Sequence, residues 1–212
     1  MAQFKTALVL GATGLVGKAL IKQLQNDPRY KQVTCLVRRP MPSSVVSHEQ
    51  KKVNWLVIDF ESLQEYEGYF KVDHVYCCLG TTIQKAGSRE AFRKVDFEYV
   101  HVAAQLARAQ RCKSFVWISS IGANAKSANF YLRVKGELEN AIMGMSQLKN
   151  AAAVRPSLLL GERHENRPLE DIAQTIAPVL GMLLVGPLKK YRPVSAIEVA
   201  HEMIKLQVFD GD

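Results

Sequence analysis

Tyr131 and Lys135 are the residues of this sequence best suited to acid/base chemistry. Only three residues separate them at the start of a predicted helix, so their side chains lie one above the other on the same face. A neighbouring ammonium stabilises a phenolate and lowers the pKa of a tyrosine from about 10 towards working pH. Such a tyrosine can serve as a general acid or base. The spacing also arises by chance, but it becomes specific behind Ser119 and Ser120, which end a predicted strand.

A glycine-rich stretch near the N-terminus has the pattern of a turn that binds a pyrophosphate. Gly11 allows a sharp exit from the preceding apolar strand, and Gly14 lets the backbone approach the phosphates. Gly17 lets the following helix pack closely, and the free N–H groups at the start of that helix face the anion. The expected ligand is a dinucleotide, whereas the alternative is a plain glycine turn. The other predicted cofactor-binding positions of the turn are Ala12, Thr13, Leu15 and Val16.

Two arginines, Arg38 and Arg39, directly follow a second predicted strand at residues 33–37. In a dinucleotide-binding sheet the tip of this strand meets the adenosine ribose, where arginine accommodates a 2′-phosphate and an acidic residue selects a free hydroxyl. The basic tip therefore favours NADP(H), with NAD(H) as the second choice. The alternative is a solvated loop pair.

Further cofactor contacts are predicted where the third and fourth strands end. Asp59 follows the strand at residues 53–58 and either accepts from the adenine amino group or caps the helical segment behind it. Leu79 and Gly80 follow a strand that begins at His74. Ligands of parallel sheets lie at the carboxyl edge where the strand order reverses, so these two residues should line the cofactor path.

Strands alternate with helices along the chain, which implies crossover connections and a parallel sheet. We expect an α/β fold in which one doubly wound parallel sheet carries helices on both faces, in a single domain over residues 1–212. A long helix capped by Ser88 is expected to bury one face, and a small part at residues 161–192 is expected to cover the substrate. The expected buried face of that helix consists of Val95, Tyr99, Val102 and Leu106.

The composition excludes several other classes of protein. The 212 residues are 48% hydrophobic, enough for one core, and the net charge of +8 is spread along the chain rather than gathered in a basic tract. An anionic cofactor explains this charge, and no nucleic-acid partner is expected. The four cysteines lack the paired spacing of a zinc site, so buried thiols and no metal are expected. Neither a bilayer-spanning run nor a secretory signal is evident, which predicts a cytoplasmic protein without a membrane partner.

Over its whole length the chain resembles the extended or atypical short-chain dehydrogenases/reductases, whose fold is the Rossmann fold. Within that superfamily it is most similar to the Tat-interacting-protein oxidoreductase-like branch. The motifs that carry the resemblance are the Gly11 to Gly17 turn, Arg38-Arg39-Pro40, Cys78-Leu79-Gly80-Thr81-Thr82, Val95-Asp96 with Tyr99-Val100, Ser119-Ser120, Asn129-Phe130-Tyr131, Lys135-Gly136-Glu137 and Arg155-Pro156.

The resemblance implies a role for each residue of the catalytic set. Tyr131 is the acid/base, and Lys135 holds the nicotinamide ribose and lowers the pKa of the tyrosine. A serine orients the substrate oxygen: Ser119 lies at the usual distance from the tyrosine, and Ser120 at the usual place after the strand, so both stay open. Similar proteins also contact the cofactor after the sixth strand, which here corresponds to Leu159 and Arg167, and Arg167 equally suits pairing with nearby glutamates.

The predicted function is NADP(H)-dependent interconversion of a carbonyl and an alcohol in a small-molecule substrate, by a monomer or homodimer. In the reductive direction the cofactor gives a hydride to the carbonyl carbon while Tyr131 protonates the oxygen. The alternative is a regulator that senses NADP(H) on the same fold without turnover, because a fold does not determine a function.

Overall fold

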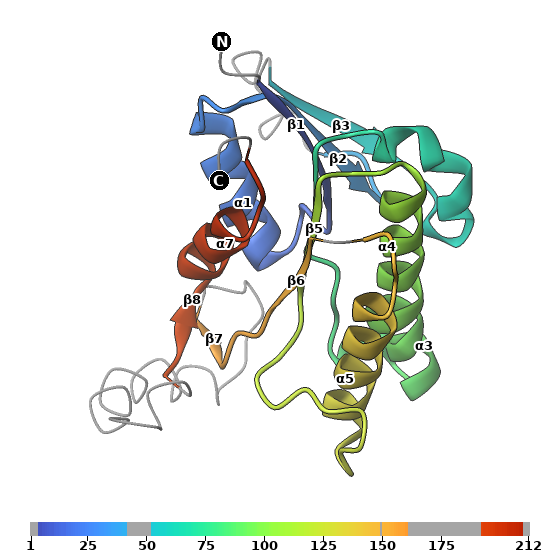
Figure 1. Cartoon of the computed structure of the whole chain (residues 1–212). Coiled ribbons are helices and arrows are strands. Elements are labelled where there is room, and N and C mark those ends of the chain that lie inside the picture. The colour runs from blue at the N-terminus through green and yellow to red at the C-terminus, as the bar shows by residue number, and fades with distance from the viewer. Residues whose placement is uncertain (1–3, 42–51, 149, 161–191, 210–212) are drawn as a thin grey trace.

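The computed structural model describes residues 4–41, 52–148, 150–160 and 192–209, and its centre is a six-stranded parallel sheet (Figure 1). The strand order is β3-β2-β1-β4-β5-β6, and every neighbouring pair is parallel. The prediction of a doubly wound parallel sheet is confirmed. The strands are β1 (Lys5–Leu10), β2 (Tyr30–Val37), β3 (Val53–Val57), β4 (His74–Cys77), β5 (Ser114–Ile118) and β6 (Ala151–Val154).

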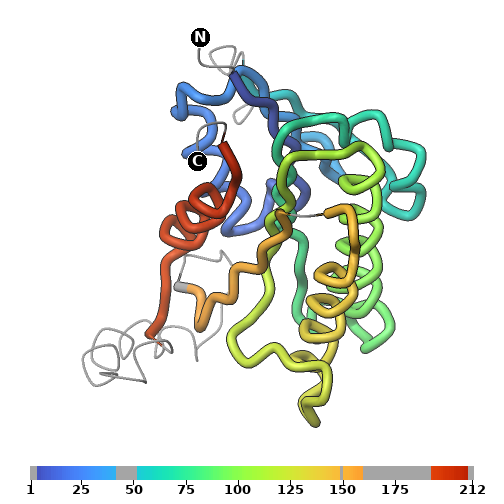
Figure 2. Tube along the Cα trace, viewed as in Figure 1, coloured from blue at the N-terminus to red at the C-terminus, as the bar shows by residue number. Residues whose placement is uncertain are grey.

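Helices cover both faces of the sheet because the strands are apolar on both sides. In β1, Ala7 and Val9 pack on one face, whereas Leu8 and Leu10 pack on the other, as the alternation of a strand requires. Helices α1 (Leu15–Asn26) and α7 (Ala196–Lys205) cover the first face, where they lie side by side although they come from opposite ends of the chain (Figures 1 and 2). The second face carries η1 (Phe60–Phe70), α3 (Arg89–Arg93), α4 (Tyr99–Ala109) and α5 (Phe130–Met143).

The strand order reverses between β1 and β4, as the sequence predicts. After β3 the chain returns to pair β4 with the free side of β1, so Leu10 lies opposite Cys77. Cys77 in turn lies opposite Trp117 of β5. The carboxyl ends of these central strands therefore meet at one edge, which is where a ligand of this type of sheet binds. Small elements complete the described chain: α2 (Ile83–Ala86), η2 (Lys94–Glu98), β7 (Leu159–Leu160) and β8 (Val194–Ser195).

The long helix predicted after Ser88 is interrupted by a π-helical turn, and of the four residues on its expected buried face only Leu106 is fully buried. Ser88 does cap the helix, since its hydroxyl accepts from the Ala91 N–H at 3.0 Å. The π-helical segment η2 separates α3 from α4 and shifts the helical register. The buried side chains are consequently Phe92, Asp96, Val100, Ala103, Ala104, Leu106 and Ala107, whereas Val95, Tyr99 and Val102 are half-buried.

Candidate cofactor and active site

The turn between β1 and α1 needs glycine at two positions for its own packing. Gly11 has a φ of +77°, and a Cβ added there would lie 2.5 Å from the backbone of Cys78 at the end of β4. A Cβ on Gly17 would lie 2.2 Å from the Gly11 carbonyl oxygen. A Cβ on Gly14 would contact the Gly11 carbonyl oxygen at 3.3 Å, and it would meet no other atom within 4 Å in the described part of the chain. The turn therefore has no space for a side chain at Gly11 or Gly17, whereas beside Gly14 there is room for a ligand.

The first amides of α1 have no side-chain cap within the described residues. Its N-cap is Gly14, and its first turn holds no acidic residue. Five other helical segments begin with a side chain that accepts from a backbone N–H, namely Asp59 for η1, Thr82 for α2, Ser88 for α3, Asn129 for α5 and Ser195 for α7. The open N–H groups and the helix dipole suit the pyrophosphate of a dinucleotide.

The remaining predicted positions of this turn divide between surface and core. Thr13 is exposed and Leu15 is half-buried beside Gly14. Ala12 and Val16 are 1% and 4% exposed and belong to the core between the sheet and α1. Any contact of Ala12 and Val16 with a cofactor would therefore come from their backbone.

Arg38 and Arg39 are exposed directly after β2, at the carboxyl edge of the sheet. Asp59 follows β3 and is the cap of η1, because its Oδ1 accepts from the Glu61 N–H at 2.9 Å. Of the two roles left open for Asp59, the structure thus supports the helix cap. The neighbouring Tyr99 hydroxyl donates to Glu61 at 2.6 Å, so the acidic groups here already have protein partners.

Lys135 is buried at the ends of β4 and β5. Its ammonium lies 2.7 Å from Oδ1 of Asp96, with the two side chains 3% and 1% exposed, and it donates to the Ile118 carbonyl of β5 at 3.4 Å. The other Asp96 oxygen accepts from the Thr81 N–H at 2.8 Å. Burial raises the pKa of Asp96, and the Lys135 ammonium opposes that shift.

Leu79 and Gly80 lie next to this buried ion pair. Leu79 is half-buried against the core, whereas Gly80 is exposed. A Cβ on Gly80 would lie 3.5 Å from Asp96 Oδ1 and 4.0 Å from Lys135 Nζ. The predicted cofactor path along Gly80 therefore runs directly over the Asp96–Lys135 pair.

Sequence reasoning missed Asp96 as a site residue. It appeared only within a family motif, because the expected helical register put Val95 on the buried face. A signal was nevertheless present, since Asp96 stands four residues after Phe92 and four before Val100, in the middle of an apolar stripe. A charged residue in such a stripe needs a buried partner.

Helix α5 presents the predicted catalytic residues and is seated by Gly136. A Cβ there would lie 2.2 Å from the Ala125 nitrogen, so the helix touches the backbone of the preceding loop. Asn129 caps the helix by accepting from the Leu132 N–H at 3.2 Å. Tyr131 lies in the first turn, half-buried, with its ring centroid 5.6 Å from that of Phe92.

The two serines after β5 differ in their surroundings. Ser119 is 2% exposed, and within the described residues its Oγ has no hydrogen-bond partner. Ser120 is half-buried, and its hydroxyl donates to the Ile121 carbonyl at 3.3 Å. Ser119 therefore keeps a hydroxyl for which the described protein supplies no partner.

Two predicted contacts after β6 fare differently. Leu159 lies in β7, where it is half-buried against the core of the α1 face. Arg167 and the predicted substrate-covering part, apart from Arg192, lie outside the described residues. The four cysteines are free thiols; Cys35 and Cys77 are buried as predicted, whereas Cys78 and Cys112 are half-buried. None of the helices in the described ranges has the length and hydropathy that crossing a membrane requires.

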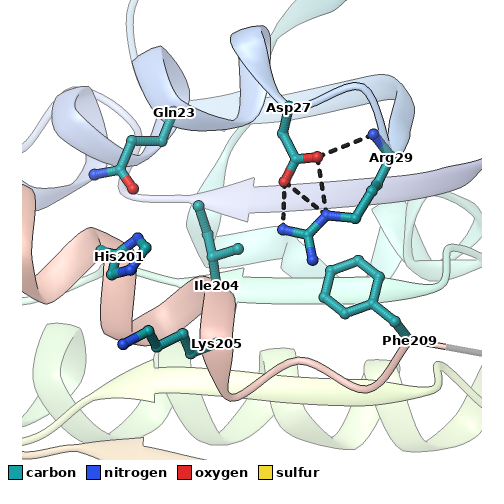
Figure 3. Close-up of a pocket in the computed structure, with 7 residues that line it drawn as sticks. All are labelled: Gln23, Asp27, Arg29, His201, Ile204, Lys205 and Phe209. Atoms are coloured by element: carbon teal, nitrogen blue, oxygen red, sulfur yellow. Dashed lines mark hydrogen bonds and ion pairs between the residues drawn. The ribbon is translucent and has the colours of Figure 1, made fainter. Parts of the chain in front are cut away.

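A cavity of about 470 Å³ lies away from this site, beside the start of β2 (Figure 3). Arg29 donates to Asp27 there, and its guanidinium stacks on Phe209 at 4.0 Å from the ring centroid. Gln23, His201, Ile204 and Lys205 complete its lining. None of the residues predicted to bind cofactor or substrate contributes to this lining.

Curated relatives share much of the sequence. Protein HTATIP2 of Rattus norvegicus is 39% identical over 173 residues, which cover 81% of this chain and 70% of that protein. Protein FMP52 of Candida albicans is 35% identical over 202 residues, covering 92% and 84%. Several FMP52 relatives, including the Scheffersomyces stipitis protein at 36% identity, are named mitochondrial. The prediction of a cytoplasmic protein is therefore wrong by this comparison, and the missing secretory signal was too weak a basis for it.

Solved structures agree on the fold at much lower sequence identity. MoeE5 in complex with UDP-glucose and NAD superposes with a TM-score of 0.70 at 16% identity, over 97% of this chain and 73% of that one. The ADP-L-glycero-D-manno-heptose-6-epimerase of Helicobacter pylori gives 0.70 at 17% identity, over 97% and 74%. These neighbours share the fold of this chain, and the HTATIP2 relative confirms the resemblance seen in the sequence. A family model described as NAD(P)H-binding matches residues 11–177, and the chain accordingly belongs to this NAD(P)H-binding family of the Rossmann fold.

Proposed function

We propose that this protein is an NADP(H)-dependent oxidoreductase that interconverts a carbonyl and an alcohol. The position of Lys135 carries the proposal. Its buried ammonium lies under Gly80 and contacts the end of β5, one residue before Ser119. A desolvated cation at the ligand edge of a Rossmann sheet is suited to hold an oxygen-rich ligand and to stabilise negative charge that develops beside it.

A bound nicotinamide would supply the hydride that is added to, or removed from, the substrate carbon. The chain supplies the proton and the orientation. Tyr131 gives a proton to the substrate oxygen in the reductive direction and removes it in the oxidative direction. The Ser119 hydroxyl donates a hydrogen bond to the same oxygen without giving up its proton. Ser119 is preferred over Ser120 because its Oγ has no partner among the described residues.

The preference for NADP(H) is proposed from Arg38 and Arg39. Both guanidinium groups are exposed at the tip of β2, and the nearby carboxylates of Asp59 and Glu61 already accept hydrogen bonds from the protein. The guanidinium groups of Arg38 and Arg39 are therefore available for charge-assisted hydrogen bonds to a 2′-phosphate, each of which contributes about 1.5–3 kcal/mol.

The test is a fluorescence titration of the purified full chain with NADPH and with NADH. Replacing both arginines by alanine should weaken NADPH binding by at least about tenfold and leave NADH nearly unchanged. The control is the Lys22→Ala, Lys31→Ala double variant, which removes the same charge from exposed positions away from the strand tip. Equal losses for both cofactors would exclude the proposed preference.

Turnover is tested with a panel of aldehydes, ketones and quinones by following NADPH oxidation. Cofactor oxidation above background, abolished by Tyr131→Phe, supports an enzyme. Tight NADPH binding without any turnover, together with a protein partner retained only when cofactor is present, would instead support the sensing regulator.

A further inference from the structure

The cavity beside the start of β2 has the size of a small-molecule site. Its volume of about 470 Å³ lies within the range of about 300–1,000 Å³ that is typical of ligand pockets. Residues from α1 and the turn before β2 line one side, and residues from α7 and the segment behind it line the other (Figure 3). A ligand in this cavity would therefore bridge two regions that lie far apart in the sequence.

Arg29 presents one side of its guanidinium to this cavity in a fixed orientation. Its Nε and Nη2 donate to Asp27 at 2.9 and 2.6 Å, and the group stacks on Phe209, 4.0 Å from the ring centroid. The remaining nitrogen, Nη1, makes no hydrogen bond within the described residues, and Figure 3 shows it pointing away from Asp27 towards α7. Because Asp27 and Phe209 already hold the guanidinium, it loses little side-chain entropy when it binds an acceptor.

His201 and Lys205 bring two further donors to the cavity from α7. They are four residues apart, which places both side chains on one face of the helix. Figure 3 shows them on the same side of α7, with Ile204 between them and Arg29. Both are exposed, and within the described ranges neither has a hydrogen-bond or ion-pair partner. The lining thus offers nitrogen donors on both sides of an apolar side chain.

Positive charge predominates around this cavity. Among the described residues that line it, Asp27 is the acidic one, and its carboxylate is already paired with Arg29. Lys205 adds a second cation to the lining, and the ammonium of Lys52 donates to the Asp27 carbonyl nearby. A negatively charged ligand is therefore favoured over a neutral or a cationic one.

Stabilisation of the fold explains only part of this arrangement. Lys205 lies in the last turn of α7, where a cation complements the helix dipole by about 0.3–1 kcal/mol. The Arg29 side chain is half-exposed, so its pair with Asp27 adds no more than about 1 kcal/mol. Neither effect requires that His201 and the outer nitrogen of Arg29 line the same cavity.

We propose that this cavity binds a small organic anion with two acidic groups. Arg29 Nη1 donates to one group, His201 and Lys205 donate to the other, and Ile204 contacts the carbon skeleton between them. Phosphate and carboxylate groups both suit these donors, because a guanidinium and an ammonium form charge-assisted hydrogen bonds with either. The proposed site is separate from the dinucleotide turn, so the inference does not depend on the proposed function.

The first test is isothermal titration calorimetry of the full chain with fructose 1,6-bisphosphate and with adipate. Fructose 6-phosphate and hexanoate are the matched probes, since each keeps the skeleton and has one acidic group. At least one doubly acidic probe should bind at least about tenfold more tightly than its counterpart, because it gains further charge-assisted hydrogen bonds. NADPH is present in excess, so that the turn before α1 is not open to the probes.

The double variant His201→Gln, Lys205→Gln then locates the binding. Both positions are exposed and the Arg29–Asp27 pair stays intact, so the fold should be retained. Affinity for the doubly acidic probe should fall by at least about tenfold. The control is Lys22→Gln, Lys31→Gln, which removes two exposed cations that lie near the lining in sequence but do not belong to it, and it should bind as the wild type does.

Three results would overturn the proposal. They are a Kd above about 1 mM for both doubly acidic probes, equal affinities for the singly acidic counterparts, and equal losses in the α7 variant and the control. A chain that binds no dinucleotide but binds a doubly acidic probe through His201 and Lys205 would retain this site and reject the proposed function.

Discussion

Polar groups at the two edges of the central sheet differ in whether they have partners within the protein. At the amino edge, polar groups pair with one another. Asp73 accepts from both the N–H and the hydroxyl of Thr6, at 2.9 and 3.0 Å, and lies 3.4 Å from Lys113. The Ser114 hydroxyl donates to Gln207. These pairs join the starts of the strands to the C-terminal segment, so this edge is closed.

Buried tyrosines continue this closed network. His74 Nε2 lies 2.8 Å from the Val208 carbonyl, which only accepts, so Nε2 carries the hydrogen of the neutral ring. Nδ1 then accepts from the Tyr30 hydroxyl at 2.6 Å, and the Tyr30 oxygen accepts from Tyr76 at 2.6 Å. Each polar atom of this buried chain therefore has a partner, as a stable core requires.

The carboxyl edge leaves polar groups available. The amides of α1 have no side-chain cap within the described residues, the Ser119 Oγ has no partner there, and Arg38 and Arg39 are exposed. Leaving a buried polar group without a hydrogen bond costs about 1–3 kcal/mol. Polar groups at the amino edge therefore stabilise the fold by pairing with one another, whereas polar groups at the carboxyl edge could pair with a ligand.

The largest expected effect is a loss of turnover, and it should distinguish Tyr131 at the carboxyl edge from Tyr30 at the amino edge. Tyr131→Phe should lower turnover by about 10²–10⁴-fold, as expected for loss of an acid/base group, while stability changes by no more than about 0.5 kcal/mol. Steady-state kinetics with a substrate from the panel, and urea unfolding, measure the two quantities. Wild-type turnover in this variant would contradict the proposed mechanism.

Tyr30→Phe is the matched variant at the amino edge, and the opposite outcome is expected there. Removing this hydroxyl leaves His74 Nδ1 and the Tyr76 hydroxyl without their partner, which should lower the free energy of unfolding by about 1–3 kcal/mol. NADPH affinity and turnover should stay at wild-type values. A selective loss of turnover would break the division between the two edges.

A dependence of stability on pH is expected from His74. Burial lowers the pKa of His74 from 6.5 to about 4. Between those pH values the unfolded chain binds the proton and the native state does not, so acidification favours unfolding. The free energy of unfolding should fall by about 3 kcal/mol as the pH drops from above 6.5 to 4, with no contribution above that window.

This pH effect is measured by urea unfolding at a series of pH values, with His74→Asn as the reference. The variant should be less stable near neutral pH, because its side chain does not reproduce the bonds to Tyr30 and Val208. Its stability should nevertheless depend less on pH between 6.5 and 4. Equal pH slopes in the two proteins would show that His74 does not titrate on unfolding.

The smallest expected effect sharpens the contrast between α1 and α7. Ser195 caps α7 by accepting from the Glu198 N–H at 3.2 Å, and the Glu198 carboxylate accepts from the Ser195 N–H at 2.8 Å. Ser195→Ala should therefore lower stability by about 1 kcal/mol in thermal or urea unfolding, without weakening NADPH binding. A variant that binds NADPH poorly would show that this helix start also belongs to the ligand edge.

Much of the fold could be predicted from local sequence. The apolar run before Gly11, the glycine spacing and the helix behind it define a strand, a turn and a helix through steric preferences of neighbouring residues. The capping box at Ser195 is equally local. Alternation of strands and helices then leaves few topologies, because crossover connections in a parallel sheet share one hand.

The sequence by itself thus determined the Rossmann sheet, the edge of that sheet where a ligand is expected, and the shared helix face of Tyr131 and Lys135. Only the tertiary structure decided which partners these groups meet. The spacing placed Asp96 in an apolar stripe, but periodicity assumes a regular helix and could not anticipate the π-helical turn or the pairing of Asp96 with Lys135. The Asp59 cap and the different surroundings of the two serines after β5 likewise depend on how segments pack. Local preferences act between neighbours in the chain, whereas burial and pairing are settled by residues that meet only when the chain is folded.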